Sequence, residues 1–332
     1  MVIGLSGGVD SAASALLLRR EYEVVGLHLI LYRAEDLQAA RKVSQLLNIP
    51  LRILNLRGEF REKIMDYFAR EYRRGRTPNP CALCNFQMKF RYLEEVRREE
   101  GADFIATGHY AKVVEKEGRF YLAPGKDREK SQEYFLALLP EELLSRTLFP
   151  LGELTKGEAK RLAGRMAKVR ESQDICFVGA GKYHEFLERE YGFSPQKGDI
   201  ISPSGQKIGE HSGFYKFTVG QRRGIGVASS EGPLYVLRIS PGDNSVVVGT
   251  RREAHFSNME VELKVWKAEE EGIFKVKLRY RHPGALAKVK IKAPRAEVRF
   301  LSPQFAPAPG QLAVFYDRED LMVGAGFISR AF

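Results

Sequence analysis

Cysteine and long apolar runs are both scarce in this sequence. The 332 residues include only three cysteines, a small and odd number that excludes a disulfide-stapled secreted scaffold. No stretch approaches the roughly 20 apolar residues that a membrane-spanning helix needs. The start of the chain also lacks the charged segment and apolar core of a signal peptide. We therefore expect a soluble, cytoplasmic protein without a membrane partner.

Acidic residues are in deficit as well. The chain has 53 Lys and Arg against 42 Asp and Glu, a formal net charge of +11. This excess favours a polyanionic partner, and nucleic acid over lipid because no amphipathic membrane helix is evident. Many basic proteins bind nothing anionic, so charge alone leaves the partner open. Hydrophobic residues make up 44%, an ordinary globular fraction that predicts two or three folded domains.

Short apolar runs alternate with helical patterns in the first half of the chain. This alternation predicts βαβ units and an α/β domain whose parallel sheet has helices on both faces. Thr155 and Glu158 have the spacing of a capping box that opens a basic helix up to about Ala167. The expected strands are residues 2–5, 23–31, 51–56 and 104–106, and the expected helices are residues 10–20, 36–47, 59–72 and 85–99.

The sequence pattern changes after about Tyr191. From there Gly, Pro and Ser separate short β-rich runs, and helical periodicity is lost. The pattern predicts two small β domains after the α/β domain, with a seam near residues 250–257. We expect domains over residues 1–191, 192–256 and 257–332.

Residues 6–11, Ser-Gly-Gly-Val-Asp-Ser, lie where the first expected strand turns into the first helix. Two glycines let backbone N–H groups approach an anion, and the helix N-terminus and the Ser6 and Ser11 hydroxyls favour phosphate. Asp10 is expected to hold Mg²⁺ or to brace the turn. The segment is neither a Walker A loop nor Gly-x-Gly-x-x-Gly. It resembles the pyrophosphate loop of the N-type ATP pyrophosphatases, which activate a carbonyl or amide oxygen by adenylation.

The three cysteines fall in two places. Cys81 and Cys84 form a Cys-x-x-Cys pair just before the helix expected from Asn85, and Cys176 stands far along the chain. A helix N-terminus stabilises a thiolate, so Cys84 is expected to be the more acidic thiol. Cys176 alone could equally be a small buried hydrophobe. One Cys-x-x-Cys pair cannot complete a zinc site, whereas three cysteines can hold an iron–sulfur cluster with one open iron.

Motifs spread over nearly the whole chain carry a more specific resemblance. They are residues 4–11, 77–85, 106–110, 130–136, 172–177, 218–224, 279–281 and 309–316. In these segments the chain resembles the tRNA-specific 2-thiouridylases, which convert the wobble uridine of certain tRNAs to 2-thiouridine. The resemblance implies an adenine nucleotide α-hydrolase-like first domain and a C-terminal β-barrel that contacts tRNA. It also implies ATP with Mg²⁺, the anticodon stem-loop of tRNA and a protein that donates persulfide or sulfide.

The resemblance implies roles for individual residues. Cys84 is implied as the catalytic cysteine and Cys176 as the carrier of the persulfide sulfur. An ATP site is implied for Gly4, Leu5, Ser6, Gly7, Gly8, Val9, Asp10, Ser11, Leu29 and Gly108. Contacts with the flipped target base are implied for Asn79, Pro80 and Cys81, and other tRNA contacts for His109, Lys130, Ser131, Gln132, Arg279, Tyr280 and Gln311.

Cys81 departs from the family pattern, in which Asp is common at this position. A thiol there could act as a cluster ligand or as a third redox partner, so two routes stay open. In the first, a persulfide on Cys176 supplies the sulfur and a Cys84–Cys176 disulfide remains. In the second, Cys81, Cys84 and Cys176 ligate an iron–sulfur cluster whose open iron binds the attacking sulfide. We favour the persulfide route.

Basic residues also predict an RNA surface. They alternate with apolar residues over 275–292, which places cations on one face of two strands, the first of them expected over residues 274–280. Tyr280 offers a stacking plane. A base stacked in the anticodon would have to be extruded to reach the site. Two further groups extend the expected footprint over all three domains: Arg70, Arg73, Arg74 and Arg76, and Lys156, Lys160, Arg161, Arg165 and Lys168.

Two rival functions remain. A pyrophosphatase-loop synthetase or amidotransferase acting on a small molecule would need neither the three cysteines nor the basic β domains. A non-catalytic tRNA-binding protein would not need an intact loop at residues 6–11 together with Cys84 and Cys176. We therefore favour an ATP-dependent tRNA-uridine 2-sulfurtransferase.

Overall fold

The structure is a computed structural model of the whole chain, and it describes all residues except 33–36, 165, 168–174, 180 and 231. By its contacts the chain divides into two compact units. The first comprises residues 1–64, 81–177 and 318–323, and the second comprises residues 65–80, 178–317 and 324–332. Each unit has a buried apolar core of its own.

A five-stranded parallel sheet forms the centre of the first unit and confirms the predicted α/β fold. Its strand order is β3-β2-β1-β4-β7. The central strand has fully buried Val2 and Ile3, because helices pack on both of its faces. The strands are β1 (Val2–Gly4), β2 (Val25–Ile30), β3 (Leu51–Asn55), β4 (Ile105–Ala106) and β7 (Thr147–Leu148).

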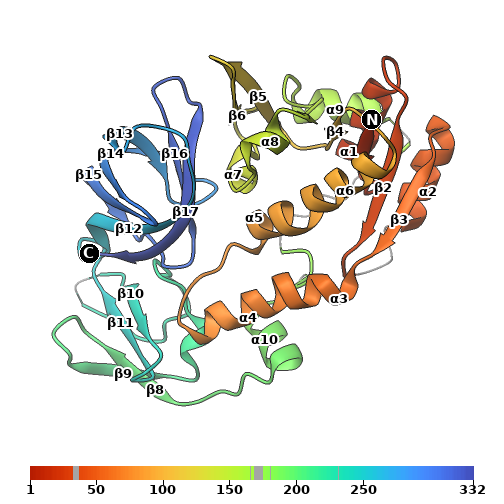
Figure 1. Cartoon of the computed structure of the whole chain (residues 1–332). Helices are drawn as coiled ribbons and strands as arrows, with labels where there is room; N and C mark the ends of the chain where they lie inside the picture. The colour runs from red at the N-terminus through yellow and green to blue at the C-terminus, as the bar shows by residue number, and fades with distance from the viewer. Residues whose placement is uncertain (33–36, 165, 168–174, 180, 231) are drawn as a thin grey trace. The chain divides into compact units, whose positions relative to one another are not determined.

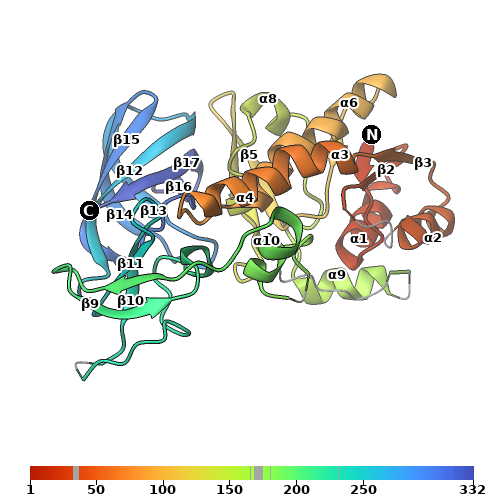
Figure 2. The same cartoon turned by 90° about the horizontal axis from the view of Figure 1, so that it is seen from below.

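Helices cover both faces of this sheet, as Figure 2 shows. Three of them, α1 (Val9–Leu18), α2 (Leu37–Leu47) and α9 (Lys156–Ala163), lie on one face, and α6 (Arg91–Glu99) lies on the other. The predicted capping box at Thr155 is confirmed: its side chain accepts from the Glu158 N–H, and Glu158 accepts from the Thr155 N–H. The cap therefore sets where α9 begins.

The remaining elements of this part of the chain are short. The expected helix over 59–72 is present as α3 (Arg57–Phe60), the π-helix η1 (Arg61–Met65) and α4 (Asp66–Arg73). The expected helix over 85–99 begins earlier and comprises α5 (Pro80–Cys84), the π-helix η2 (Asn85–Phe90) and α6. It begins at Pro80 because proline is well suited to a first helical turn. The others are β5 (Ala111–Lys116), β6 (Arg119–Pro124), α7 (Glu133–Leu136) and α8 (Glu141–Leu144).

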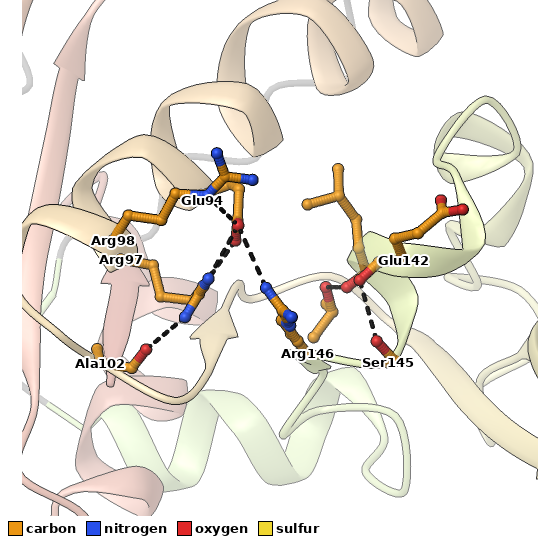
Figure 3. A network of polar contacts seen from close by, with 9 residues as sticks. Glu94, Arg97, Arg98, Ala102, Glu142, Ser145 and Arg146 are labelled. Atoms are coloured by element: carbon orange, nitrogen blue, oxygen red, sulfur yellow. Dashed lines mark hydrogen bonds and ion pairs between the residues drawn. The ribbon is translucent and has the colours of Figure 1, made fainter.

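A polar network fixes α6 beside the sheet (Figure 3). The Glu94 carboxylate accepts from Arg97 at 2.7 and 2.9 Å and from Arg98 at 2.8 Å, and Arg146 lies 3.6 Å away. Arg97 also donates to the Ala102 carbonyl at 2.6 Å. The Arg97 guanidinium is the main cause of the lowered pKa of Glu94, with Arg98 contributing. This carboxylate therefore ties α6 to the turns that precede β4 and β7.

The second unit is mainly β-structure, as predicted. After α10 (Tyr183–Tyr191) comes a four-stranded sheet of order β10-β11-β8-β9, with a 3-10 turn η3 (Phe214–Lys216). Its strands are β8 (Gly198–Ile201), β9 (Lys207–His211), β10 (Tyr235–Ser240) and β11 (Ser245–Gly249).

The closed barrel implied for the C-terminal part is confirmed, with strand order β12-β15-β14-β13-β16-β17 (Figure 1). One expectation was wrong: the strand expected to reach Tyr280 ends at Lys277. The His282 N–H donates to the Arg279 carbonyl at 3.0 Å, so the backbone turns here and does not continue the ladder. The strands are β12 (His255–Trp266), β13 (Glu271–Lys277), β14 (Ala285–Lys292), β15 (Arg295–Phe305), β16 (Leu312–Tyr316) and β17 (Met322–Ala331).

Among the described residues, no helix combines the length and the apolar character that crossing a lipid bilayer would require.

Candidate functional site

The glycine-rich loop lies at the carboxyl edge of the parallel sheet. It connects β1 to α1, and the Leu5 N–H donates to the Leu27 carbonyl of β2 at 2.8 Å. Leu29 stands at the end of β2, and Gly108 follows β4, which pairs with β1 on its other side. The structure thus brings together the residues for which an ATP site was implied. The carboxyl edge is where open α/β sheets bind ligands.

Hydrogen bonds within the loop hold it in shape. The Ser11 hydroxyl accepts from the Ser6 N–H at 3.2 Å and donates to the Gly8 carbonyl at 3.0 Å. The Ser6 and Ser11 hydroxyl oxygens are 3.1 Å apart, and the Gly8 N–H donates to the Ser6 hydroxyl at 3.3 Å. The first N–H groups of α1 have no partner within a helix and are directed out of its N-terminus. The loop is therefore a preformed cradle for an anion.

Two glycines are required by close packing around this loop. Gly7 has φ of 80°, and a Cβ there would lie 2.5 Å from the backbone of Ala39 and Ala40 in α2. A Cβ on Gly108 would lie 2.8 to 2.9 Å from the backbone of Asp10 and Ser11. Any larger residue at either position would displace the loop.

Asp10 is held by two distant side chains. Lys156, the first residue of α9, donates to both carboxylate oxygens at 2.7 and 2.8 Å. The Tyr110 hydroxyl donates to the same carboxylate at 2.7 Å. Of the two roles expected for Asp10, this geometry supports bracing the turn. A Mg²⁺ ion at this carboxylate would lie beside the Lys156 ammonium, which repels it.

Residues 130–132, for which tRNA contacts were implied, form hydrogen bonds around Tyr110. The Gln132 side chain accepts from the Tyr110 N–H at 3.0 Å, and the Gln132 N–H donates to the Tyr110 carbonyl at 2.7 Å. Ser131 is only 5% exposed, and its hydroxyl accepts from the Gly125 N–H. Lys130 is exposed. Of these three residues, Lys130 is therefore the most accessible to tRNA.

His109 is packed among aromatic rings. Its ring centre lies 6.1 Å from that of Phe90 and 6.3 Å from that of Phe149, and its Nδ1 is 2.8 Å from the Thr107 hydroxyl. Burial, with a smaller contribution from Lys89, lowers the pKa of His109 to about 3. The imidazole is therefore neutral at physiological pH and cannot attract a phosphate by charge.

The three cysteines of the first unit are free thiols that interact electrostatically. Cys81 and Cys84 lie one turn apart in α5. Cys176 is adjacent to Phe177, whose buried ring packs edge-on against Phe60 at 5.8 Å. The structure thus brings the Cys-x-x-Cys pair and the distant third cysteine into one cluster.

The prediction that Cys84 is the more acidic thiol was wrong. Burial raises the pKa of Cys84 to about 12 and that of Cys81 to about 11, and it also raises the pKa of Cys176. Helix α5 begins at Pro80, so Cys84 lies a turn inside the helix and is only 7% exposed. Cys81 and Cys176 reach water, yet protein crowds them enough to disfavour a thiolate. Lys89 opposes this effect at all three thiols.

The three thiols are the residues that would hold an iron–sulfur cluster. Within the described part of the chain, no three His, Cys, Asp or Glu side chains are grouped as metal ligands. The soft thiolates are of the right chemical type for an iron–sulfur cluster. Their arrangement here is that of free thiols, so holding a cluster would require them to converge.

In the second unit, two sequence motifs meet at the segment that precedes Cys81. The Thr77 N–H donates to the Pro309 carbonyl at 2.7 Å, and the Gln311 side chain donates to the Pro78 carbonyl at 3.3 Å. Asn79 is 6% exposed, and its backbone is hydrogen-bonded to the Tyr67 hydroxyl. Residues 309–311 therefore hold the segment that directly precedes Asn79 and Pro80.

Comparisons with known proteins agree along the whole chain. Family models match residues 1–180 (tRNA methyl transferase HUP domain), 184–250 (tRNA methyl transferase PRC-barrel domain) and 253–328 (aminomethyltransferase beta-barrel domain). The tRNA-specific 2-thiouridylase MnmA of Syntrophotalea carbinolica is 42% identical, covering 99% of this chain and 98% of that protein. The protein of the same name from Geobacter metallireducens is 39% identical, covering 100% of this chain and 97% of its own length. This chain belongs to the tRNA-specific 2-thiouridylase family.

Solved structures are more distant from this thiouridylase chain. One, described as a predicted subunit of tRNA methyltransferase from Methanocaldococcus jannaschii, is 16% identical and covers 57% of this chain and 87% of its own. Its TM-score of 0.36 is too low to bear on fold or function.

Ion pairs neutralise some, but not all, of the cations on the face predicted for the thiouridylase barrel. Lys290 lies 3.4 Å from Glu271, and Lys292 lies 2.7 Å from Glu297. By contrast Lys288 stands directly opposite Arg299 across β14 and β15, and neither has an acidic partner in the described part of the chain. Like charges placed opposite each other destabilise a sheet. This pair is therefore the part of the face best suited to a polyanion.

The remaining residues with implied tRNA contacts lie in the turn after β13. Arg279 is exposed and donates to the Phe305 carbonyl at 3.3 Å, and Tyr280 is half-buried. Arg165, Lys168 and the motif residues 172–174 lie outside the described residues. Lys156, expected to be part of a basic RNA-binding helix, is directed to Asp10 instead.

Sequence reasoning missed three residues of the site. Tyr110 and the Lys156–Asp10 pair could not be found because their contacts join segments far apart in the chain. Lys89 lies five residues after Cys84, a spacing that puts two residues on different faces of a regular α-helix, so the sequence offered no signal for it.

Proposed function

We propose that this 2-thiouridylase adenylates O2 of the wobble uridine of tRNA with ATP and replaces that oxygen with sulfur. The products are 2-thiouridine, AMP and pyrophosphate. The observation that carries the proposal is the presence, in one compact unit, of a preformed anion cradle at residues 6–11 and a cluster of three free thiols. A small-molecule synthetase would need the first feature but not the second.

In the adenylation step the loop receives the pyrophosphate of ATP. Backbone N–H groups at the start of α1 and the Ser6 hydroxyl stabilise the charge that develops as pyrophosphate leaves, while the Ser11 hydroxyl holds the turn through the Gly8 carbonyl. Asp10, neutralised by Lys156, keeps the turn in place without repelling the phosphates. Mg²⁺ would accompany ATP mainly through phosphate oxygens, since the Asp10 carboxylate is already engaged.

In the sulfur-transfer step a donor protein first loads Cys176 as a persulfide. The terminal sulfur attacks C2 of the adenylated uridine and displaces AMP, which gives an adduct joined to Cys176 by a disulfide. The Cys84 thiolate then attacks the Cys176 sulfur, releases 2-thiouridine and forms the Cys84–Cys176 disulfide.

Because burial raises their pKa values, these thiols are mainly protonated before substrate binds. Most of Cys84 is protonated near neutral pH because burial disfavours its thiolate. Lys89 is the cation that lowers the pKa of each thiol, and a bound substrate that brings it closer would activate them together. Before substrate binds, the thiols are therefore protected from adventitious oxidation.

We infer that residues 1–191 perform this chemistry and that residues 192–256 and 257–332 help to bind tRNA. Asn79, Pro80 and Cys81 would contact the flipped base, and His109 would contribute by shape rather than charge. The second route, with Cys81, Cys84 and Cys176 as ligands of an iron–sulfur cluster, is favoured only by the proximity of the three thiols.

The test measures 2-thiouridine on unmodified tRNA with ATP and a persulfide donor, using iron-free protein and anaerobically cluster-reconstituted protein. We expect product from the iron-free protein. Cys176→Ala should abolish product while tRNA affinity is retained, because Cys176 carries the sulfur. Product from the reconstituted protein alone would replace the persulfide route with the cluster route. No product from either preparation would contradict the proposed function.

A further inference from the structure

Cys81 and Cys84 occupy consecutive turns of one short helix. Both lie in α5, three residues apart, so their side chains are on the same face. Helix geometry places their Cα atoms roughly 5 Å apart, within the range that a disulfide spans. A bridge also requires the Cβ atoms to approach from about 5–6 Å to about 4 Å, so this short helix must tighten when the pair is oxidised.

The three thiols differ in their access to water. Cys84 is 7% exposed, whereas Cys81 and Cys176 are exposed. An external reductant can therefore reach Cys81 and Cys176 but not Cys84. Because Cys176 and Cys84 each interact electrostatically with Cys81, all three sulfurs lie in one neighbourhood.

We propose that Cys81 is the resolving thiol that reopens the Cys84–Cys176 disulfide after each turnover. This inference rests on the persulfide route of the proposed function. The Cys81 thiolate, a minor form that Lys89 favours, attacks the Cys84 sulfur after its proton has passed to solvent. The Cys84–Cys176 bond breaks, the Cys81–Cys84 bond forms, and Cys176 leaves as a thiolate that takes up a proton. No net oxidation or reduction occurs in this exchange.

The exchange lets Cys176 accept the next sulfur while an external reductant acts at Cys81. Without it, a reductant attacking exposed Cys176 would leave a mixed disulfide on the residue that must accept the next sulfur. With it, Cys176 is free at once, and an external dithiol reduces the Cys81–Cys84 disulfide through exposed Cys81. Lys89, which lowers the pKa of Cys176, stabilises the departing thiolate.

The experiment follows one turnover without reductant. The full-length protein is loaded with persulfide and desalted, then mixed with ATP and unmodified tRNA. It is next quenched with an alkylating reagent and mapped by mass spectrometry. For each 2-thiouridine formed, we expect one Cys81–Cys84 disulfide and one alkylated Cys176. In the isosteric variant Cys81→Ser, each product should instead be matched by one Cys84–Cys176 disulfide.

A second measurement compares steady-state turnover with the first turnover, using dithiothreitol as the dithiol. In Cys81→Ser this ratio should fall by about tenfold, because reopening becomes slow. A Cys84–Cys176 disulfide as the main species in the unaltered protein would overturn the resolving role. So would an unchanged ratio in Cys81→Ser. Failure of the loaded, unaltered protein to form any 2-thiouridine is a separate result that contradicts the proposed function itself, and the resolving step with it.

Discussion

Asp10 has two partners, and both come from far along the chain. Lys156 neutralises its carboxylate and Tyr110 adds a hydrogen bond, so the loop is braced by residues that do not belong to its own motif. Hydrogen bonds to charged groups contribute about 1.5–3 kcal/mol each. The carboxylate is partly exposed, so water recovers part of that contribution when a partner is removed.

Replacement of Lys156 should therefore weaken ATP binding. We expect Lys156→Gln to raise KM for ATP about tenfold, or about 1.4 kcal/mol, and to leave KM for tRNA unchanged. Lys160→Gln is the matched control, since Lys160 is an exposed residue on the same helix. Steady-state kinetics with each substrate varied in turn provide the measurement. An equal rise in KM for ATP in both variants would show that helix charge, rather than the Asp10 contact, is responsible.

At the scale of elements, one short segment joins the implied base-binding residues to the barrel. The Thr77 N–H donates to the Pro309 carbonyl, the Gln311 side chain donates to the Pro78 carbonyl, and Arg76 forms an ion pair with Glu71. A buried carbonyl left without its donor costs about 1–3 kcal/mol. Gln311 therefore has a structural task that a contact with tRNA alone would not require.

Hydrogen exchange can distinguish these two roles of Gln311. In the RNA-free protein, Gln311→Leu should speed exchange of the Asn79 amide roughly tenfold, because the loss of about 1.4 kcal/mol loosens the segment. Gln304→Leu, a change in the same unit but away from this segment, is the control. If Gln311 served only to contact tRNA, exchange in the RNA-free protein would be unchanged and only tRNA affinity would fall.

The order of elements could be predicted because it depends on local patterns. Alternating apolar runs, the capping box at Thr155 and the turn at residues 6–11 each have a local cause, and the structure has them in place. The acidity of Cys84 and the direction of Lys156 could not be predicted, because burial and long-range pairing decide them. The end of β13 was misplaced because the alternation continues past Lys277 in sequence while the backbone turns.

At the scale of the whole molecule, net charge overstates the cations that are available to RNA. Several cations of the barrel are paired with acids, whereas Lys288 and Arg299 face each other unneutralised in the described part of the chain. Each phosphate contact contributes roughly 0.7 to 0.9 to the dependence of log K on log salt concentration. The two kinds of cation should therefore differ in their contribution to tRNA binding.

Salt titrations of tRNA binding should show this difference. We expect the double variant Lys288→Gln, Arg299→Gln to reduce the magnitude of the salt slope by about 1.5. The control Lys290→Gln, Lys292→Gln should change it less, because those cations are already paired with Glu271 and Glu297. Filter binding of unmodified tRNA over a range of salt concentrations gives the slopes. Equal slopes for the two variants would remove the barrel face from the RNA footprint.

The division of the chain into interleaved units has a consequence for how the protein is made. The first unit includes residues 318–323, where Glu319 pairs with Lys116 and Asp320 lies 3.6 Å from Arg128. A ribosome releases the chain from the N-terminus, and domains generally fold as units during synthesis. The nucleotide-binding unit therefore lacks its last segment until almost the entire polypeptide has left the ribosome. A shortened message would yield a loop and a cysteine cluster in a unit that is never completed.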